Sequence, residues 1–205
     1  MATLKKYDLK GKEVGTVKVA DELLAVSAHA QSIKDYIVAI RNNARQWSAN
    51  TKRRMDSHHT GRKPHPQKGQ GRSRQGDLAA PHYKGGAVVW GPRPKDVHTR
   101  INQKERRAAV RFLLAEKIKA GRVHVLAGEM KEPKTKQMAG FLDGLKIGEK
   151  RVLMLGDSGN LSKSLRNIPK TEFLSMKQVN GYEVIRCQDV VVLESAVEQL
   201  VSFLG

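Results

Sequence analysis

The chain has 205 residues, and its 38 Lys or Arg side chains outnumber its 20 Asp or Glu side chains, giving a formal net charge of +18. With 39% hydrophobic and 5% aromatic residues, it has the composition of a soluble globular protein of one domain or a small pair. No apolar run approaches the ~20 residues that cross a bilayer, so no membrane partner is expected. The first fifteen residues lack the apolar core of a signal peptide. A lone cysteine, Cys187, excludes an internal disulfide and favours a reducing, cytoplasmic location.

The positive charge is concentrated in one third of the chain. Residues 41–111 hold 18 Lys or Arg and 4 Asp or Glu, a net of +14, whereas the other 134 residues carry a net of only +4. Such a field attracts nucleic acid or anionic membrane. The basic stretch lacks the Leu, Phe and Trp face of a helix that lies on a membrane. Nucleic acid is therefore the expected partner.

The first hundred residues predict a hairpin and one helix. Turn residues at 7–11 lie between two stretches that favour strand, which predicts a short hairpin from Leu4 to Val19. From His29 to Arg45, isoleucines recur at three- and four-residue spacing, which predicts an amphipathic helix.

The second half predicts alternating helices and strands. Asn102, with Glu105 three residues later, predicts a capping box that opens a helix ending at Gly121. Runs apolar on both faces predict buried parallel strands at 123–126, 152–155 and 190–193. Helices are expected at 135–145, 161–168 and 195–204, the last opened by a second box at Ser195. The sequence thus predicts an α/β three-layer sandwich with a mostly parallel central sheet, built from residues 1–47 and 100–205.

Residues 48–99 predict a long extended internal loop. Between Ser48 and Gly86 the only large aliphatic residues are Met55 and Leu78, so this stretch cannot build a core. Loops of such length are usually functional or disordered, and a basic insertion that returns to a folded domain favours contact with RNA or DNA over a solvated tail. The candidate nucleic-acid-contacting residues are Arg41, Arg45, Lys52, Arg53, Arg54, Arg62, Lys63, Lys68, Arg72, Arg74, Lys84, Arg93, Arg106 and Arg107.

Three aromatic residues flank the basic stretch and could stack on bases: Trp47, Tyr83 and Trp90. For Trp90, which follows two valines, we expect packing against the domain rather than stacking.

No catalytic, metal or cofactor site is expected. The histidines His58, His59, His65 and His82 lack the paired cysteines of most zinc sites. The Gly156–Gly159 segment follows an expected strand but lacks a dinucleotide fingerprint and a nucleophile elbow, which indicates a tight turn. Cys187 is expected in the core. Two alternatives remain: an α/β nucleotide-binding enzyme with a basic nucleic-acid tether, using the turn after Leu155, and an mRNA-binding autoregulator.

The loop also carries a family resemblance. It reads Gly61-Arg62-Lys63-Pro64-x-x-Gln67-Lys68-Gly69-x-Gly71-Arg72-x-Arg74-Gln75-Gly76, followed by Pro81, Gly85-Gly86 and Gly91-Pro92-x-Pro94. With Ala44-Arg45-Gln46, Arg106-Arg107-Ala108, Lys134-Thr135-Lys136 and Arg166-Asn167-Ile168-Pro169, it resembles the bacterial-type large-subunit ribosomal protein L4 family (uL4). The resemblance covers nearly the whole chain.

The resemblance implies a non-enzymatic constituent of the large ribosomal subunit that binds its rRNA early in assembly. It implies that the loop threads through rRNA and that its tip lines the polypeptide exit tunnel, beside the L22-family protein and the passing nascent peptide. By motif, the tip comprises Gln67, Lys68, Gly69, Gln70, Gly71, Arg72 and Arg74.

Overall fold

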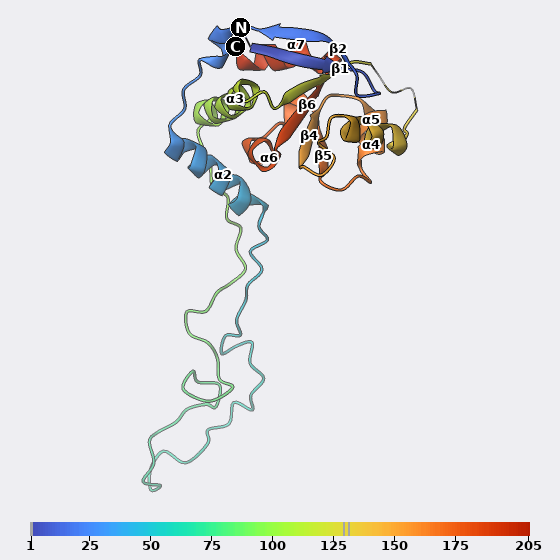
Figure 1. Ribbon diagram of the computed structural model, residues 1–205. Helices are drawn as coiled ribbons and strands as arrows, with labels where there is room; N and C mark the ends of the chain where they lie inside the picture. The colour runs from blue at the N-terminus through green and yellow to red at the C-terminus, as the bar shows by residue number, and fades with distance from the viewer. Residues whose placement is uncertain (1, 129, 131) are drawn as a thin grey trace. The chain divides into compact units, whose positions relative to one another are not determined.

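The computed structural model describes residues 2–128, 130 and 132–205. The chain divides into two compact units, one made of Met1–Arg41 with Arg100–Gly205 and the other of Asn42–Thr99. All strands formed by these described residues lie in the first unit (Figure 1). None of the helices among the described residues is long and apolar enough to cross a membrane.

The first unit is built on a six-stranded sheet in the order β2-β1-β3-β6-β4-β5. Its strands are β1 (Ala2–Tyr7), β2 (Glu13–Val19), β3 (Val123–Leu126), β4 (Val152–Leu155), β5 (Thr171–Leu174) and β6 (Asp189–Leu193). Only the β1–β2 pair is antiparallel, and every other neighbouring pair is parallel. The predicted α/β fold with a mostly parallel sheet is confirmed.

Helices and short helical turns connect these strands (Figure 1). They are α1 (Asp21–Leu24), α2 (Ala30–Ala44), α3 (Gln103–Lys119), α4 (Thr135–Gly144), α5 (Gly159–Leu165), the 3-10 turn η1 (Met176–Gln178), α6 (Gly181–Arg186) and α7 (Glu194–Leu204). The last residues of α2 belong to the second unit.

The central strands are buried on both faces, which is why they are apolar at every position. All residues of β4 and all residues of β6 are buried. Successive side chains of a strand point to opposite faces, so other elements cover the sheet on both sides. This is the three-layer arrangement that the continuous apolar runs predicted.

The predicted hairpin is present as β1 and β2. Its turn is closed by hydrogen bonds from the Gly11 N–H to the Asp8 carbonyl (2.8 Å) and from the Asp8 N–H to the Lys12 carbonyl (2.9 Å). Gly11 has a φ of 74°, in the left-handed region where glycine avoids the steric penalty of a Cβ.

The end of α3 follows the expectation in detail. The Arg122 N–H donates to the Lys117 carbonyl and the Gly121 N–H donates to the Ile118 carbonyl, both at 3.0 Å. With Gly121 at a φ of 66°, these bonds form a Schellman motif. The start of α3 differs: Asn102 takes the N-cap position but makes no side-chain cap bond, and its amide donates to the Glu105 carboxylate (3.3 Å). The predicted capping box is therefore not formed.

The second capping box, at Ser195, was also wrong. Helix α7 begins at Glu194, immediately after β6, with Leu193 at the N-cap and no side-chain cap bond. Because strand leads into helix without a loop, Ser195 already lies within the first turn. Helix α5 begins earlier and ends earlier than expected, and β5, α1 and α6 had no sequence prediction.

The buried sheet predicts a large cost for removing a central side chain. Leu155 in β4 is 0% exposed, and we expect Leu155→Ala to lower the free energy of unfolding by about 2–5 kcal/mol. Val14 in β2 is 63% exposed, and Val14→Ala should change it by no more than about 0.5 kcal/mol. Urea denaturation followed by circular dichroism tests both variants. Equal effects would contradict this assignment of the core.

Candidate nucleic-acid interface

The second unit is a hydrogen-bonded antiparallel stem without strands. The Asn43 side chain bonds the Thr99 backbone in both directions, at 3.1 and 2.8 Å. Further along, the Lys95 N–H donates to the Trp47 carbonyl (3.3 Å) and the Val88 N–H donates to the Lys52 carbonyl (3.1 Å). We call these paired segments, residues 43–52 and 88–99, the stem. Residues 45–102, all described, contain no helix or strand (Figure 1).

A compact turn region, residues 77–87, adjoins the stem. The Ala87 N–H donates to the Ala79 carbonyl (3.0 Å), and both alanines are buried. A Cβ on Gly86 would lie 2.1 Å from the Ala80 carbonyl oxygen, so only glycine fits there. The pKa of Asp77 is lowered by the Ala79 N–H that it accepts and by the charge of Arg54. These contacts replace the missing apolar core with local hydrogen bonds.

The predicted tip residues lie in a tight, exposed turn. His65 Nε2 and the Ser73 carbonyl oxygen are 2.9 Å apart across its base. Gly69 and Gly71 have φ values of 85° and 60°, which non-glycine residues adopt only with strain. Every residue from Gln67 to Arg74 is exposed. The turn therefore presents both polar side chains and bare backbone to the surroundings.

The basic side chains of the second unit are largely free of internal acids. Residues 42–99 contain twelve Lys or Arg and three Asp, a net charge of +9. Within this range, Arg54 alone forms an ion pair, with Asp77 at 3.4 Å. The exposed candidates here are Arg45, Lys52, Arg53, Arg54, Arg62, Lys63, Lys68, Arg72, Arg74 and Lys84, and Arg93 is half-buried. Their charge remains available to an external polyanion.

Three other candidates lie in the first unit. Arg41 is exposed on α2, and Arg106 and Arg107 are exposed on α3. The α3 pair borders a hollow of about 290 Å³ together with Gln103, Lys177 and an apolar floor that includes Phe203. The sequence reasoning did not single out Lys177, because only the fold brings η1 beside α3.

The three aromatic candidates differ in their surroundings. The guanidinium of Arg45 lies 4.4 Å from the centroid of the Trp47 ring, and the Lys95 ammonium lies 5.5 Å from it. The ring centroids of Tyr83 and His82 are 4.4 Å apart. Trp90 is 99% exposed, so the expectation that it packs against the domain was wrong. The role of Lys95 was missed because its pairing with Trp47 depends on the stem register.

The turn after β4 has a packing role. A Cβ on Gly156 would lie 2.1 Å from Leu193 Cδ1, so glycine permits the close approach of β4 and β6. The Gly156 N–H donates to the Leu174 carbonyl (3.1 Å), and Asp157 accepts a bond from Gln199 (3.5 Å). Residues 156–158 thus form a short connection from β4 to α5, and Gly159 is the first residue of that helix rather than part of a four-residue turn.

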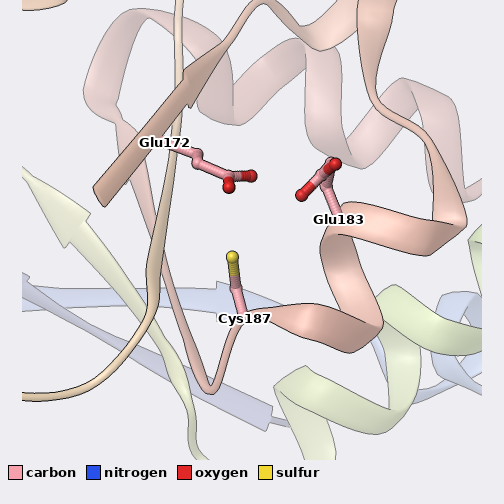
Figure 2. A group of neighbouring side chains, drawn as sticks. All are labelled: Glu172, Glu183 and Cys187. Carbon is pink, nitrogen blue, oxygen red and sulfur yellow. The ribbon is translucent and has the colours of Figure 1, made fainter. Parts of the chain in front are cut away.

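Among the described residues, one group of side chains has the proximity of metal ligands: Glu172, Glu183 and Cys187 (Figure 2). Their ligand atoms lie within 4.8 Å of one another. None of the four loop histidines belongs to this group. Arg186 donates hydrogen bonds to Glu172 (2.6 Å) and Glu183 (3.5 Å), so a protein cation already balances the carboxylates.

Protonation also balances this group. Burial, together with the hydrogen bond and charge of Glu172, raises the pKa of Glu183 from 4.5 to about 7. Burial raises the pKa of the Cys187 thiol to about 11, so the thiol stays protonated at neutral pH. Cys187 is buried, as predicted. Arg186 and the raised pKa of Glu183 together limit the negative charge of this group at neutral pH.

The raised pKa of Glu183 makes the stability of the first unit depend on pH. Between pH 4.5 and 7 the folded chain binds more protons here than the unfolded chain, so stability falls as pH rises. One pKa unit corresponds to about 1.4 kcal/mol. Allowing for solvent screening, we expect Glu183→Gln to raise the free energy of unfolding by about 1–2 kcal/mol at pH 8 and to change it little at pH 4.

Chemical denaturation at both pH values measures this difference. Glu198→Gln, which removes an exposed carboxylate from α7, is the matched control and should give no such pH-dependent gain. Equal gains from Glu183→Gln at both pH values would contradict the raised pKa.

Comparison with known proteins agrees with these features. The model of the ribosomal protein L4/L1 family matches residues 17–203. A large ribosomal subunit protein uL4 of Lachnospira eligens is 34% identical over 201 residues, which cover 98% of each chain. The uL4 proteins of Desulforudis audaxviator and Oenococcus oeni are 34% and 33% identical, over the full length of both chains in each case. The chain belongs to the ribosomal protein L4/L1 family.

Proposed function

We propose that this protein is a structural, non-enzymatic constituent of the large ribosomal subunit in the cytoplasm, and that its second unit binds large-subunit rRNA. The observation that carries the proposal is the net charge of +9 on residues 42–99, with one internal ion pair. Membership of the L4/L1 family supports it, because the relatives are named large ribosomal subunit proteins.

RNA supplies what the second unit lacks. Like charges repel in the free chain, and few apolar residues offset that repulsion. Phosphates neutralise the cations and release counterions, which favours binding and makes it depend on salt. A segment that gains order on binding can wrap a large surface, which fits a component added early in subunit assembly.

The tip of the loop, Gln67–Arg74, faces the route of the nascent peptide in this proposal, beside the L22-family protein. Its glycines leave backbone N–H and C=O groups accessible. Its Lys and Arg side chains form no ion pair with the acids of residues 42–99. A turn without large apolar side chains also offers a passing peptide little surface to adhere to.

A charge-matched pair of variants tests rRNA binding. Replacing Lys52, Arg53 and Arg54 by Gln should weaken rRNA binding at least tenfold at 100 mM salt. It should also reduce the slope of log K against log salt by about 2–3, because each lost phosphate contact contributes about 0.7–0.9. Replacing Lys10, Lys12 and Lys136, all exposed in the first unit, removes the same charge and should change the slope by less than about 1. Equal effects would show that net charge alone governs binding.

A photo-crosslinking amino acid at Gln70 tests the position of the tip. In ribosomes stalled during translation, we expect this position to crosslink to the nascent peptide. The same amino acid at Lys136 on α4 should crosslink to rRNA or to ribosomal proteins and not to the nascent peptide. Absence of nascent-chain products from Gln70, with efficient crosslinks to rRNA, would contradict a tunnel location while leaving rRNA binding intact.

A further inference from the structure

The stem contains a bulge that holds one tryptophan away from the chain. On one side of the bulge the Val88 N–H donates to the Lys52 carbonyl (3.1 Å), and on the other the Thr51 hydroxyl donates to the Pro92 carbonyl (3.3 Å). Residues 89–91 therefore lie opposite the link between two adjacent residues. Extra residues between fixed pairs have to leave the plane of the stem, as in a β-bulge.

Trp90 occupies the centre of this bulge in a strained conformation. Its φ is 57°, in the left-handed region that bulky residues rarely adopt. The next residue lies close against the opposite side of the stem, because a Cβ on Gly91 would lie 2.1 Å from the Thr51 hydroxyl oxygen. Strain of this kind costs on the order of 1–3 kcal/mol and is concentrated at functional positions.

The strain is not offset by burial of the indole. Trp90 is 99% exposed, and its neighbours Val88 and Val89 are 51% and 57% exposed. Trp47 contrasts with it, because Arg45 and Lys95 lie over its ring. Tyr83 is likewise engaged, by the ring of His82. Among Trp47, Tyr83 and Trp90, the ring of Trp90 is thus the one whose faces are accessible.

The charge around the bulge identifies the class of partner. The carbonyl of the exposed Lys52 accepts the hydrogen bond that closes one side of the bulge, and Arg93 follows two residues after Gly91, within a unit of net charge +9. An apolar protein surface gains nothing from that field, whereas a nucleic acid is attracted by it. Bases inside a duplex are already stacked on each other, so a duplex offers an exposed indole no free base face along its length, whereas an unpaired base does.

We propose that Trp90 is a stacking platform for an unpaired RNA base, held in place by the bulge of residues 89–91. This inference rests on the proposed RNA-binding function and deepens it. The flanking cations hold the backbone of the RNA, and the indole selects single-stranded over double-stranded RNA at this point.

The full chain in a Trp47→Phe background tests the proposal, because Trp90 is then the only tryptophan. Two probes are titrated at one salt concentration: decaadenylate RNA and a long RNA duplex, whose terminal base faces are few relative to its length. We expect decaadenylate to quench the Trp90 fluorescence and the duplex to bind without comparable quenching. Trp90→Ala should weaken decaadenylate binding by about 5-fold to 150-fold, the range for loss of one stacked base, and duplex binding by less than about twofold.

Two further variants separate stacking from apolar contact. Trp90→Phe keeps an aromatic face and should retain most of the affinity for decaadenylate, whereas Trp90→Leu should behave like Trp90→Ala. Decaadenylate binding without quenching, or full affinity in Trp90→Leu, would overturn the stacking role. If the Trp47→Phe protein with Trp90 intact binds neither RNA, the proposed RNA-binding function is overturned instead.

Discussion

Repulsion among like charges is the constraint on which the rest of the structure depends. Residues 42–99 hold twelve cationic side chains and three carboxylates, and they bury almost no large apolar surface. A hydrophobic core cannot form under those conditions, so backbone bonds and tight turns define the path of the chain. The first unit is stabilised differently, because its strands β4 and β6 are buried at every position and are covered on both faces. One chain thus combines a sheet that buries its own apolar side chains with a basic segment that has no core of its own.

The sheet was predictable because burial on both faces leaves a strong pattern. The runs at 123–126 and 152–155 are strands at the predicted positions, and the third run differs by one residue at its start. Element ends were less predictable. The box at Ser195 failed because β6 leads straight into α7, so that Leu193 takes the N-cap position and Ser195 is already helical. Strand β5 was missed because it lies at the sheet edge, half-buried at all four positions, and so shows no apolar run.

The candidate site was predictable in composition but not in geometry. Charge density and glycine spacing are properties of the sequence, so the cationic residues and the tip could be named in advance. The surroundings of the aromatic residues depend on which segments pair. The Lys95 ammonium lies near the Trp47 ring because residues 47 and 95 face each other in the stem. Trp90 lies in the bulge of residues 89–91, which have no counterparts on the other side of the stem. No local pattern distinguishes these outcomes.

The spacing of the stem pairs also limits how such a loop can change length. From Asn43 to Trp47 is four residues, and so is the return from Lys95 to Thr99, so the two sides advance in step. Beyond Trp47 one side takes five residues to reach Lys52, and the other takes seven between Val88 and Lys95. An insertion or deletion near the base would therefore shift every later pair. Near Trp90 the stem already accommodates two sides of unequal length. A loop of different length could therefore be joined there without shifting the pairs at 43 with 99 and 47 with 95.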